Sequence, residues 1–275
     1  MKDYTKILPP HMEKRIGEND LFLEIFDGES AFEGTNQKPP LLFVHGAYTG
    51  SWMWSRYIPH FVREGWKCYV MNLRSHYRSR VMDMTKISFE DYLEDIGTVI
   101  TECEETPIII GFSLGGILCQ KMAETVKVSG LVLIDSCISK EVNEVSPYEV
   151  LLEDTLGIVE PAPVRQEGSS IDETEDDIAF QKKYLSMESA KVFRICACWI
   201  KGIPGVSIDS RRIMCQALVI KALNSEEEDR RGRAESEHLN AEYIGFWNTT
   251  HTGLLVGQKY MAVVDRILEW LGKYY

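Results

Sequence analysis

A serine lies between two glycines in the segment 111–115, which reads Gly-Phe-Ser-Leu-Gly. This is the G-x-S-x-G pattern, and its position between a strand and a helix is more informative than the pattern alone. The apolar run Ile108–Ile110 precedes it, and a helix is expected to follow. A serine on a sharp strand-to-helix turn exposes its hydroxyl, and the N-terminus of the helix favours developing negative charge. The pattern therefore predicts that Ser113 is a nucleophile rather than an incidental serine in a structural turn.

A second pattern lies in the segment 42–52, Leu-Phe-Val-His-Gly-Ala-Tyr-Thr-Gly-Ser-Trp. His-Gly-Ala followed by Gly-Ser-Trp, together with the serine turn, resembles the α/β-hydrolase superfamily and particularly its small-molecule serine esterases. The resemblance covers nearly the whole chain. In that family this loop supplies one donor of the oxyanion hole. The resemblance thus implies that the backbone N–H groups of Ala47 and Leu114 stabilise negative charge on a substrate oxygen.

The resemblance also places the general base. The family carries its catalytic histidine in a loop near the C-terminus, after a strand and before the last helix. His251 is the histidine of this sequence in that context. Serine needs an adjacent base at neutral pH, and imidazole titrates in the right range. His45, at the end of a predicted strand, is interpreted as a hydrogen-bonded structural residue, and His238 as a surface residue.

The acid that completes a catalytic triad stays open. The family has an aspartate after its next-to-last strand, but aligning residues 213–225 puts Ser225 there. Serine cannot hold an imidazolium by charge. Glu226 follows directly, and a one-residue insertion in the loop would bring it into place. The rival is Asp135, because some family members take the acid from the end of this earlier strand. Both candidates are kept, with Glu226 slightly ahead.

The elements that must position these residues alternate between short apolar strands and amphipathic helices, which implies a mostly parallel sheet. The chain begins with a predicted pair of strands over residues 13–26. Strands are then predicted at 41–44, 67–71, 107–110, 131–134, 217–220 and 242–246, and helices at 52–64, 89–103, 114–126 and 260–271. The predicted class is α/β: the α/β-hydrolase fold, with helices on both faces of the central sheet and an inserted helical lid.

The domain organisation follows from where this alternation stops. Residues 1–135 and 213–275 are predicted to form the α/β-hydrolase core, and residues 136–212 the inserted lid. Within the lid, the acidic run Asp172–Asp177 is interpreted as a solvated face. The loops of the core place Tyr48 and Phe112 where they would line a substrate pocket.

Composition narrows the partners and the compartment. The chain has 275 residues and a formal net charge of −12, which repels phosphate backbones and anionic lipid. Nucleic acid is therefore not an expected partner, and no apolar stretch reaches the length of a membrane span. Seven scattered cysteines, and a start without the apolar run of a signal peptide, predict reduced thiols and a cytoplasmic location. We expect no metal and no cofactor, and the oligomeric state stays open.

The leading functional hypothesis is a serine hydrolase. It would cleave a small or medium carboxylic ester, thioester or lactone through an acyl-enzyme on Ser113. The same fold and triad also serve acyltransferases and lyases, so transfer or elimination is the first alternative. A small-ligand binding protein without catalysis is the second, because the acid is displaced from its usual position. The partner implied in each case is a small molecule, an acyl compound under the leading hypothesis.

Overall fold

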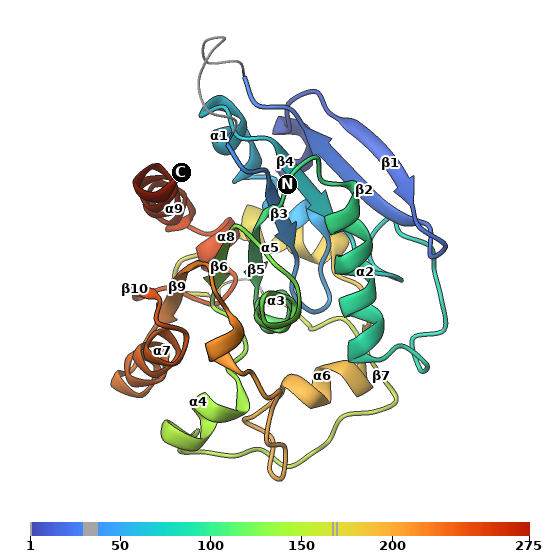
Figure 1. Ribbon diagram of the computed structural model, residues 1–275. Coiled ribbons are helices and arrows are strands. Elements are labelled where there is room, and N and C mark those ends of the chain that lie inside the picture. Colours follow the sequence, from blue (N-terminus) through green and yellow to red (C-terminus); the bar gives the residue numbers. More distant parts are fainter. Residues whose placement is uncertain (1, 30–37, 167, 169) are drawn as a thin grey trace.

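A mostly parallel sheet forms the centre of the protein (Figure 1). The computed structural model describes residues 2–29, 38–166, 168 and 170–275. Within this part of the chain the sheet has eight strands: β1 (Met12–Ile16), β2 (Leu21–Phe26), β3 (Leu41–Val44), β4 (Cys68–Met71), β5 (Ile108–Phe112), β6 (Gly130–Ile134), β9 (Gln216–Leu223) and β10 (Glu242–Trp247). The predicted α/β fold, with its mostly parallel sheet, is confirmed.

The strand order is β1-β2-β4-β3-β5-β6-β9-β10. The pairs β1–β2 and β2–β4 are antiparallel, and every later pair is parallel. Parallel strands end at one edge of the sheet, so the loops that follow β3, β5, β6 and β10 gather on the same side. That edge carries each segment that the sequence singled out for chemistry.

Helices cover both faces of the sheet (Figure 1). The elements outside the segment between β6 and β9 are η1 (Tyr4–Ile7), η2 (Ser51–Trp54), α1 (Ile58–Arg63), α2 (Phe89–Glu102), α3 (Leu114–Thr125), α7 (Glu226–Leu239), α8 (Gly253–Val256) and α9 (Tyr260–Tyr274). Successive strand residues face opposite sides of the sheet. Thus Leu42 packs in one core with residues of α2 and α3, while Leu41 and Phe43 pack in the other with residues of α1 and α9.

One predicted helix is divided. The sequence predicts a continuous helix over residues 52–64, but the structure has the 3-10 turn η2 followed by α1. The cause is Pro59, which lies at the start of α1 and has no N–H to donate to the preceding turn. The helix therefore begins anew at Ile58.

Between β6 and β9 the chain leaves the sheet. We refer to residues 136–212, predicted as a lid, as the inserted segment. It contains α4 (Lys140–Val145), β7 (Val159–Glu160), α5 (Glu175–Tyr184), β8 (Glu188–Ser189), α6 (Ala190–Cys196) and η3 (Ser210–Arg212), with β7 and β8 paired as a small antiparallel sheet.

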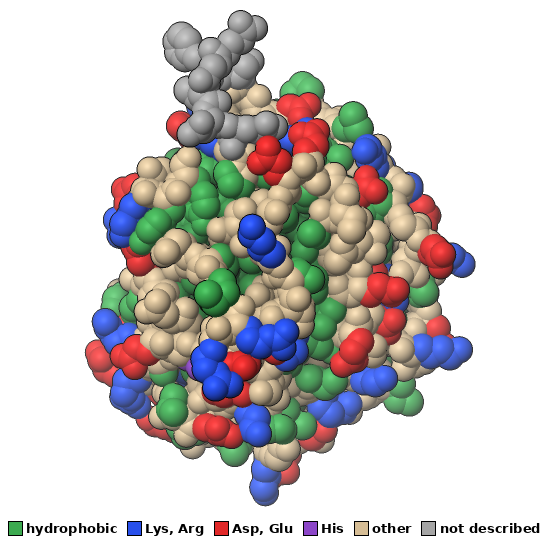
Figure 2. Space-filling model, in the orientation of Figure 1, with side chains coloured by type: hydrophobic (Ala, Val, Ile, Leu, Met, Phe, Trp, Pro, Cys, Tyr) green, Lys and Arg blue, Asp and Glu red, His purple; other side chains and the backbone are tan. Residues whose placement is uncertain are grey.

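The surface carries both signs of charge. Acidic and basic side chains are interspersed over the face seen in Figure 2, with apolar groups between them. No helix within the described residues combines the length and the apolar composition that crossing a membrane requires.

A buried carboxylate ties the inserted segment to the core. Glu188 accepts hydrogen bonds from the Tyr92 hydroxyl at 2.6 Å and from the Tyr48 N–H at 3.3 Å. The Nε2 atom of His76 lies 3.1 Å from the same carboxylate. Burial alone would lower the pKa of the His76 imidazole, but the Glu188 charge outweighs burial and raises it. The contact is thus a buried ion pair while His76 is protonated.

Replacing this carboxylate should cost stability in a pH-dependent way. With a raised folded pKa, His76 contributes stability that is fully present below its unfolded value of 6.5 and is lost as the pH rises through the folded pKa. Glu188→Gln should therefore lower the free energy of unfolding by on the order of 3 kcal/mol near about pH 6, and by less near about pH 8. Urea denaturation at the two pH values measures this.

The control is Glu153→Gln, which removes an exposed ion pair with Lys201 from the same segment. It should change the free energy of unfolding by less than about 0.5 kcal/mol at either pH. A loss for Glu188→Gln that grows as the pH rises would contradict the ion-pair assignment.

Candidate active site

Ser113 occupies the turn between β5 and α3. Its backbone has φ 55° and ψ −119°, a conformation that residues other than glycine rarely adopt. Two glycines make the turn possible. A Cβ at Gly111 would lie 2.4 Å from the Gly115 carbonyl oxygen, and one at Gly115 would lie 2.4 Å from the His45 carbonyl oxygen. The local sequence therefore produces the sharp elbow that exposes a serine hydroxyl.

His251 lies in the loop between β10 and α8, and its ring contacts the side chains of Asp135 and Phe112. Its Nδ1 atom is 2.5 Å from Oδ2 of Asp135. Its face stacks on the Phe112 ring, with centroids 4.5 Å apart and planes at 28°. With Nδ1–H donating to the carboxylate, the neutral ring keeps an unprotonated Nε2, which is the state that a general base requires.

Asp135 directly follows β6 and has φ 44°. Its Oδ1 accepts a hydrogen bond from the Ala222 N–H at 3.3 Å. Burial raises the pKa of this carboxyl, but the hydrogen bond from His251 and the nearby Lys221 ammonium outweigh burial and hold the pKa below its usual value. The carboxylate is therefore charged at neutral pH and can stabilise an imidazolium beside it.

Glu226, the other candidate acid, lies elsewhere. It is the first residue of α7 and is exposed, and the structure brings Asp135 rather than Glu226 to the imidazole. This helix is not among those predicted from the sequence. Its signal was Ser225 followed by glutamates: the Ser225 side chain accepts from the Glu228 N–H, as an N-cap does. The acidic run that favoured Glu226 is the first turn of a helix, where carboxylates complement the dipole.

The two predicted oxyanion donors come from different loops. Ala47 follows β3 and lines the same cavity as Ser113. Leu114 is the first residue of α3, where backbone N–H groups have no intrahelical acceptor. The neighbouring His45 is buried, donates through Nδ1 to the Gly46 carbonyl at 2.8 Å and accepts the Leu73 N–H at 3.1 Å. Burial lowers the pKa of His45 to about 3, so this ring is neutral and structural.

A cavity of about 500 Å³ opens onto these residues. Ser113, His251 and Asp135 all line it. The two side chains predicted to contact substrate, Tyr48 and Phe112, line it as well. Its other apolar lining includes Ile138, Tyr148, Leu185, Phe193 and Trp199, all of which come from the inserted segment. An apolar cavity with a few convergent polar groups is the usual form of a small-molecule site.

The interpretation of the acidic run Asp172–Asp177 as a solvated face is wrong for half of its members. Asp172, Glu173 and Asp177 have at most 9% of their surface exposed. Each is buried because it accepts several hydrogen bonds, which compensate the loss of water. Charge alone does not reveal such partners in a sequence: Asp172 and Glu173 accept from the distant residues Thr250 and Thr252, and Asp177 caps the start of its own helix.

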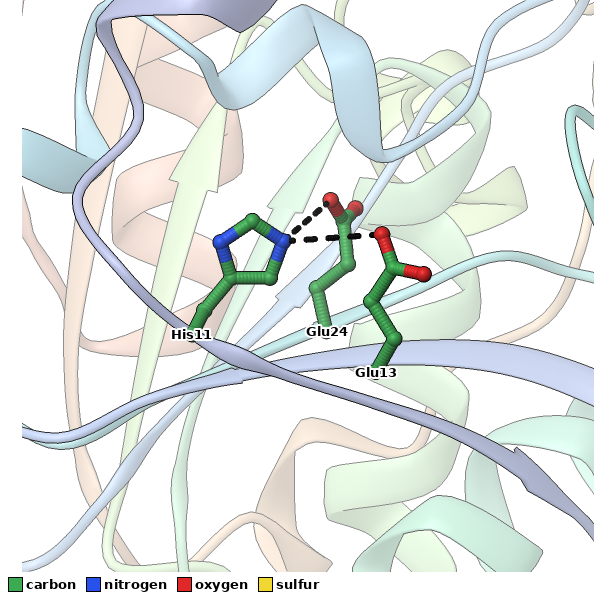
Figure 3. A group of neighbouring side chains, drawn as sticks. All are labelled: His11, Glu13 and Glu24. Atoms are coloured by element: carbon green, nitrogen blue, oxygen red, sulfur yellow. Dashed lines mark ion pairs between the residues drawn. The ribbon is translucent and has the colours of Figure 1, made fainter.

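A second group of titratable side chains lies at the β1–β2 pair, apart from the cavity lining (Figure 3). The Nε2 atom of His11 is 3.4 Å from the Glu24 carboxylate and 3.8 Å from that of Glu13. This spacing would suit a metal ion. However, Arg78 donates to both oxygens of Glu13, at 2.6 and 2.7 Å, and its positive charge opposes a cation there. We interpret the group as an ion-pair cluster, in which Glu24 raises the pKa of His11.

Known proteins share this architecture. The family described as the alpha/beta hydrolase fold matches residues 39–170. The chain has the α/β-hydrolase fold, as the resemblance in its sequence predicts. A comparison with curated proteins gives no match.

Solved structures similar to this chain cover almost all of it. The monoacylglycerol lipase of Paleococcus ferrophilus is 18% identical with a TM-score of 0.67, and the alignment covers 93% of this chain and 99% of the lipase. A thermophilic esterase from Thermogutta terrifontis is 16% identical with a TM-score of 0.64, covering 97% and 99%. The enol-lactonase from Burkholderia xenovorans LB400 is 14% identical with a TM-score of 0.66, covering 96% and 100%. At these identities the likeness establishes the fold.

Proposed function

We propose that this protein is a serine hydrolase that cleaves a small or medium carboxylic ester, thioester or lactone. The observation that carries the proposal is the charged Asp135 carboxylate at 2.5 Å from His251 Nδ1, beside a cavity that the Ser113 elbow also lines. A histidine held by a carboxylate, lining the same cavity as a serine on a sharp turn, is the arrangement that activates a hydroxyl for nucleophilic attack.

The proposed reaction has two halves. Ser113 Oγ attacks the substrate carbonyl carbon while His251 Nε2 takes the hydroxyl proton, and Asp135 stabilises the imidazolium that forms. The backbone N–H groups of Ala47 and Leu114 stabilise the tetrahedral oxyanion. The leaving alcohol or thiol departs with the proton from His251, which leaves an acyl group on Ser113. Water, deprotonated by the same histidine, then attacks the acyl carbon. As the bond from this carbon to Ser113 Oγ breaks, His251 returns the proton to Oγ, and the acid and the free serine are released.

The cavity limits the substrate. A volume of about 500 Å³ accommodates a molecule of modest size rather than a polymer. Its aromatic and aliphatic walls favour an apolar acyl or alcohol group, and Tyr48 and Phe112 are proposed as contacts to it. The similar structures include a monoacylglycerol lipase, an esterase and an enol-lactonase, named for ester and lactone substrates. These names support the bond type and do not identify the acyl chain.

Loss of the nucleophile should abolish turnover and leave the fold intact. Ser113→Ala removes one hydroxyl from a half-buried side chain and little packing, so the thermal midpoint should stay close to that of the wild type. The kcat for whichever chromogenic ester the wild type cleaves should fall by about 10⁴-fold or more. A screen of acyl chain lengths identifies that ester. Wild-type rates in Ser113→Ala on every ester would refute the assignment.

The acid is tested by a matched pair of amide variants. Asp135→Asn keeps the shape of the side chain but loses the charge that orients His251, so kcat should fall by about 10³- to 10⁴-fold with little change in KM. Glu226→Gln alters an exposed first-turn residue of α7 and should leave kcat within about twofold. The opposite ranking of the two variants would show that the chain uses Glu226 in solution.

A further inference from the structure

The ring of His251 is not fixed by burial. Its side chain is 47% exposed, and the contacts that orient it are the Asp135 carboxylate and the Phe112 ring. A half-exposed ring on a loop keeps one position only if the backbone beneath it is held. The loop comprises residues 248–252. The residues that hold its backbone in place therefore decide whether His251 Nδ1 reaches the Asp135 carboxylate.

One side of this loop is held by β9 and the residue after it. The Asn248 N–H donates to the Leu223 carbonyl at 2.9 Å, and the Asn224 side chain donates to the Thr249 carbonyl at 2.8 Å. These bonds fix the start of the loop. They do not reach the residues on either side of His251.

The other side is held by Asp172 of the inserted segment. Its carboxylate accepts hydrogen bonds from the Thr249 hydroxyl, from the Thr250 N–H at 3.1 Å and from the Thr250 hydroxyl at 2.8 Å. The side chain is nearly fully buried, with 4% of the residue exposed. A single carboxylate thus binds the two residues that directly precede His251.

Glu173 holds the residue that follows. It accepts from the Thr252 hydroxyl at 2.9 Å and is itself held by Arg165 at 2.5 Å and by Gln181 at 2.5 Å. Burial raises the pKa of Glu173, but the Arg165 charge and these hydrogen bonds outweigh burial and lower it. Arg165 also donates to the Thr252 hydroxyl at 3.1 Å, which closes the network.

The glycines of this region leave room for Asp172. A Cβ at Gly253 would lie 2.3 Å from the Asp172 carboxylate, and one at Gly257 would lie 2.8 Å from the Asp172 carbonyl oxygen. That carbonyl accepts the Gln258 N–H at 2.9 Å. The backbone after His251 therefore packs closely against Asp172 of the inserted segment.

Burying two adjacent carboxylates is costly, and hydrogen bonds do no more than offset that cost. A scaffold that needed only stability would be served as well by apolar residues. The hydrogen bonds described above join these two carboxylates to residues 249–252. We propose that Asp172 and Glu173 are positioning residues for His251. The inserted segment therefore holds the catalytic loop in place and does not only cover the cavity. This inference rests on the function proposed above.

The test uses Asp172, because Arg165 lines the cavity and a change at Glu173 would also disturb substrate binding. Asp172→Asn keeps the shape of the side chain but replaces one carboxylate oxygen with an N–H₂ group, which cannot accept a hydrogen bond from the threonines. It should lower kcat by about 10- to 100-fold and leave KM within about threefold. The pH midpoint of kcat should also move downward, because an imidazolium that loses its carboxylate gives up its proton more readily. The exposed Glu175→Gln, from the same acidic run, is the matched control and should behave like wild type.

A second pair of variants tests the inference even if Asp172→Asn does not fold. Thr249→Val removes the hydroxyl that donates to Asp172 and keeps the volume, whereas Thr249→Ser keeps the hydroxyl. The valine variant should show the same kcat loss and pH shift, and the serine variant should restore both. If Asp172→Asn does not fold, this pair alone decides.

The outcomes separate the two proposals. If the wild type cleaves esters while Asp172→Asn and Thr249→Val keep its kcat and pH midpoint, or change KM only, the positioning role is overturned and the proposed function stands. If the wild type cleaves no ester, thioester or lactone, the proposed function fails. The low-field NMR signal of the His251 Nδ1 proton then tests positioning: it should be present in wild type and lost in Asp172→Asn, and its persistence would overturn the inference.

Discussion

The bond between His251 Nδ1 and Asp135 Oδ2 is the contact on which the candidate site depends. It joins residues that are 116 positions apart in the chain. They meet because β6 and β10 flank β9 in one parallel register, which pairs Ile134 with Ile220 and Trp247 with Leu223. Parallel strands deliver their following loops to one edge, so the sheet brings the carboxylate and the imidazole into the same space.

The sheet also maintains the strain at this edge. Three residues other than glycine that follow its strands have positive φ angles of 44–55°: Ser113, Asp135 and Asn248. Such a backbone costs on the order of 1–3 kcal/mol each and persists only where the surroundings impose it. In each case the N–H donates to a carbonyl of the adjacent strand, at 2.7–3.1 Å. The ladder of the sheet thus continues one residue past the strand and fixes each side chain at the edge.

Much of this arrangement is predictable from local sequence. Fully buried parallel strands are short apolar runs, so β3, β5 and β6 are recognised without any knowledge of their partners. The elbow is recognised because Gly111 and Gly115 meet a steric demand that any such turn imposes. Local rules of this kind concern neighbours in the chain, and they place Ser113 and His251 in the loops where the structure has them.

The remainder depends on contacts between distant segments. Choosing between Asp135 and Glu226 required the length and direction of the loops that lead to His251, which no local pattern encodes. The N-cap at Ser225 was a readable local signal, and it would have assigned the glutamates to a helix. The burial of Asp172 was not readable, because its partners come from a loop 77 positions later in the chain. Acidic residues are interpreted as solvated unless such partners are known.

Covalent labelling with a fluorophosphonate, followed by mass spectrometry of the proteolysed protein, tests the roles of Ser113 and His251 most directly. The reagent captures a serine only when a neighbouring base activates it, whatever the natural substrate. One adduct per chain, on the peptide that contains Ser113, is the predicted result. Its formation should slow by orders of magnitude in His251→Ala. An unlabelled wild-type protein, or an adduct on a different residue, would contradict the account.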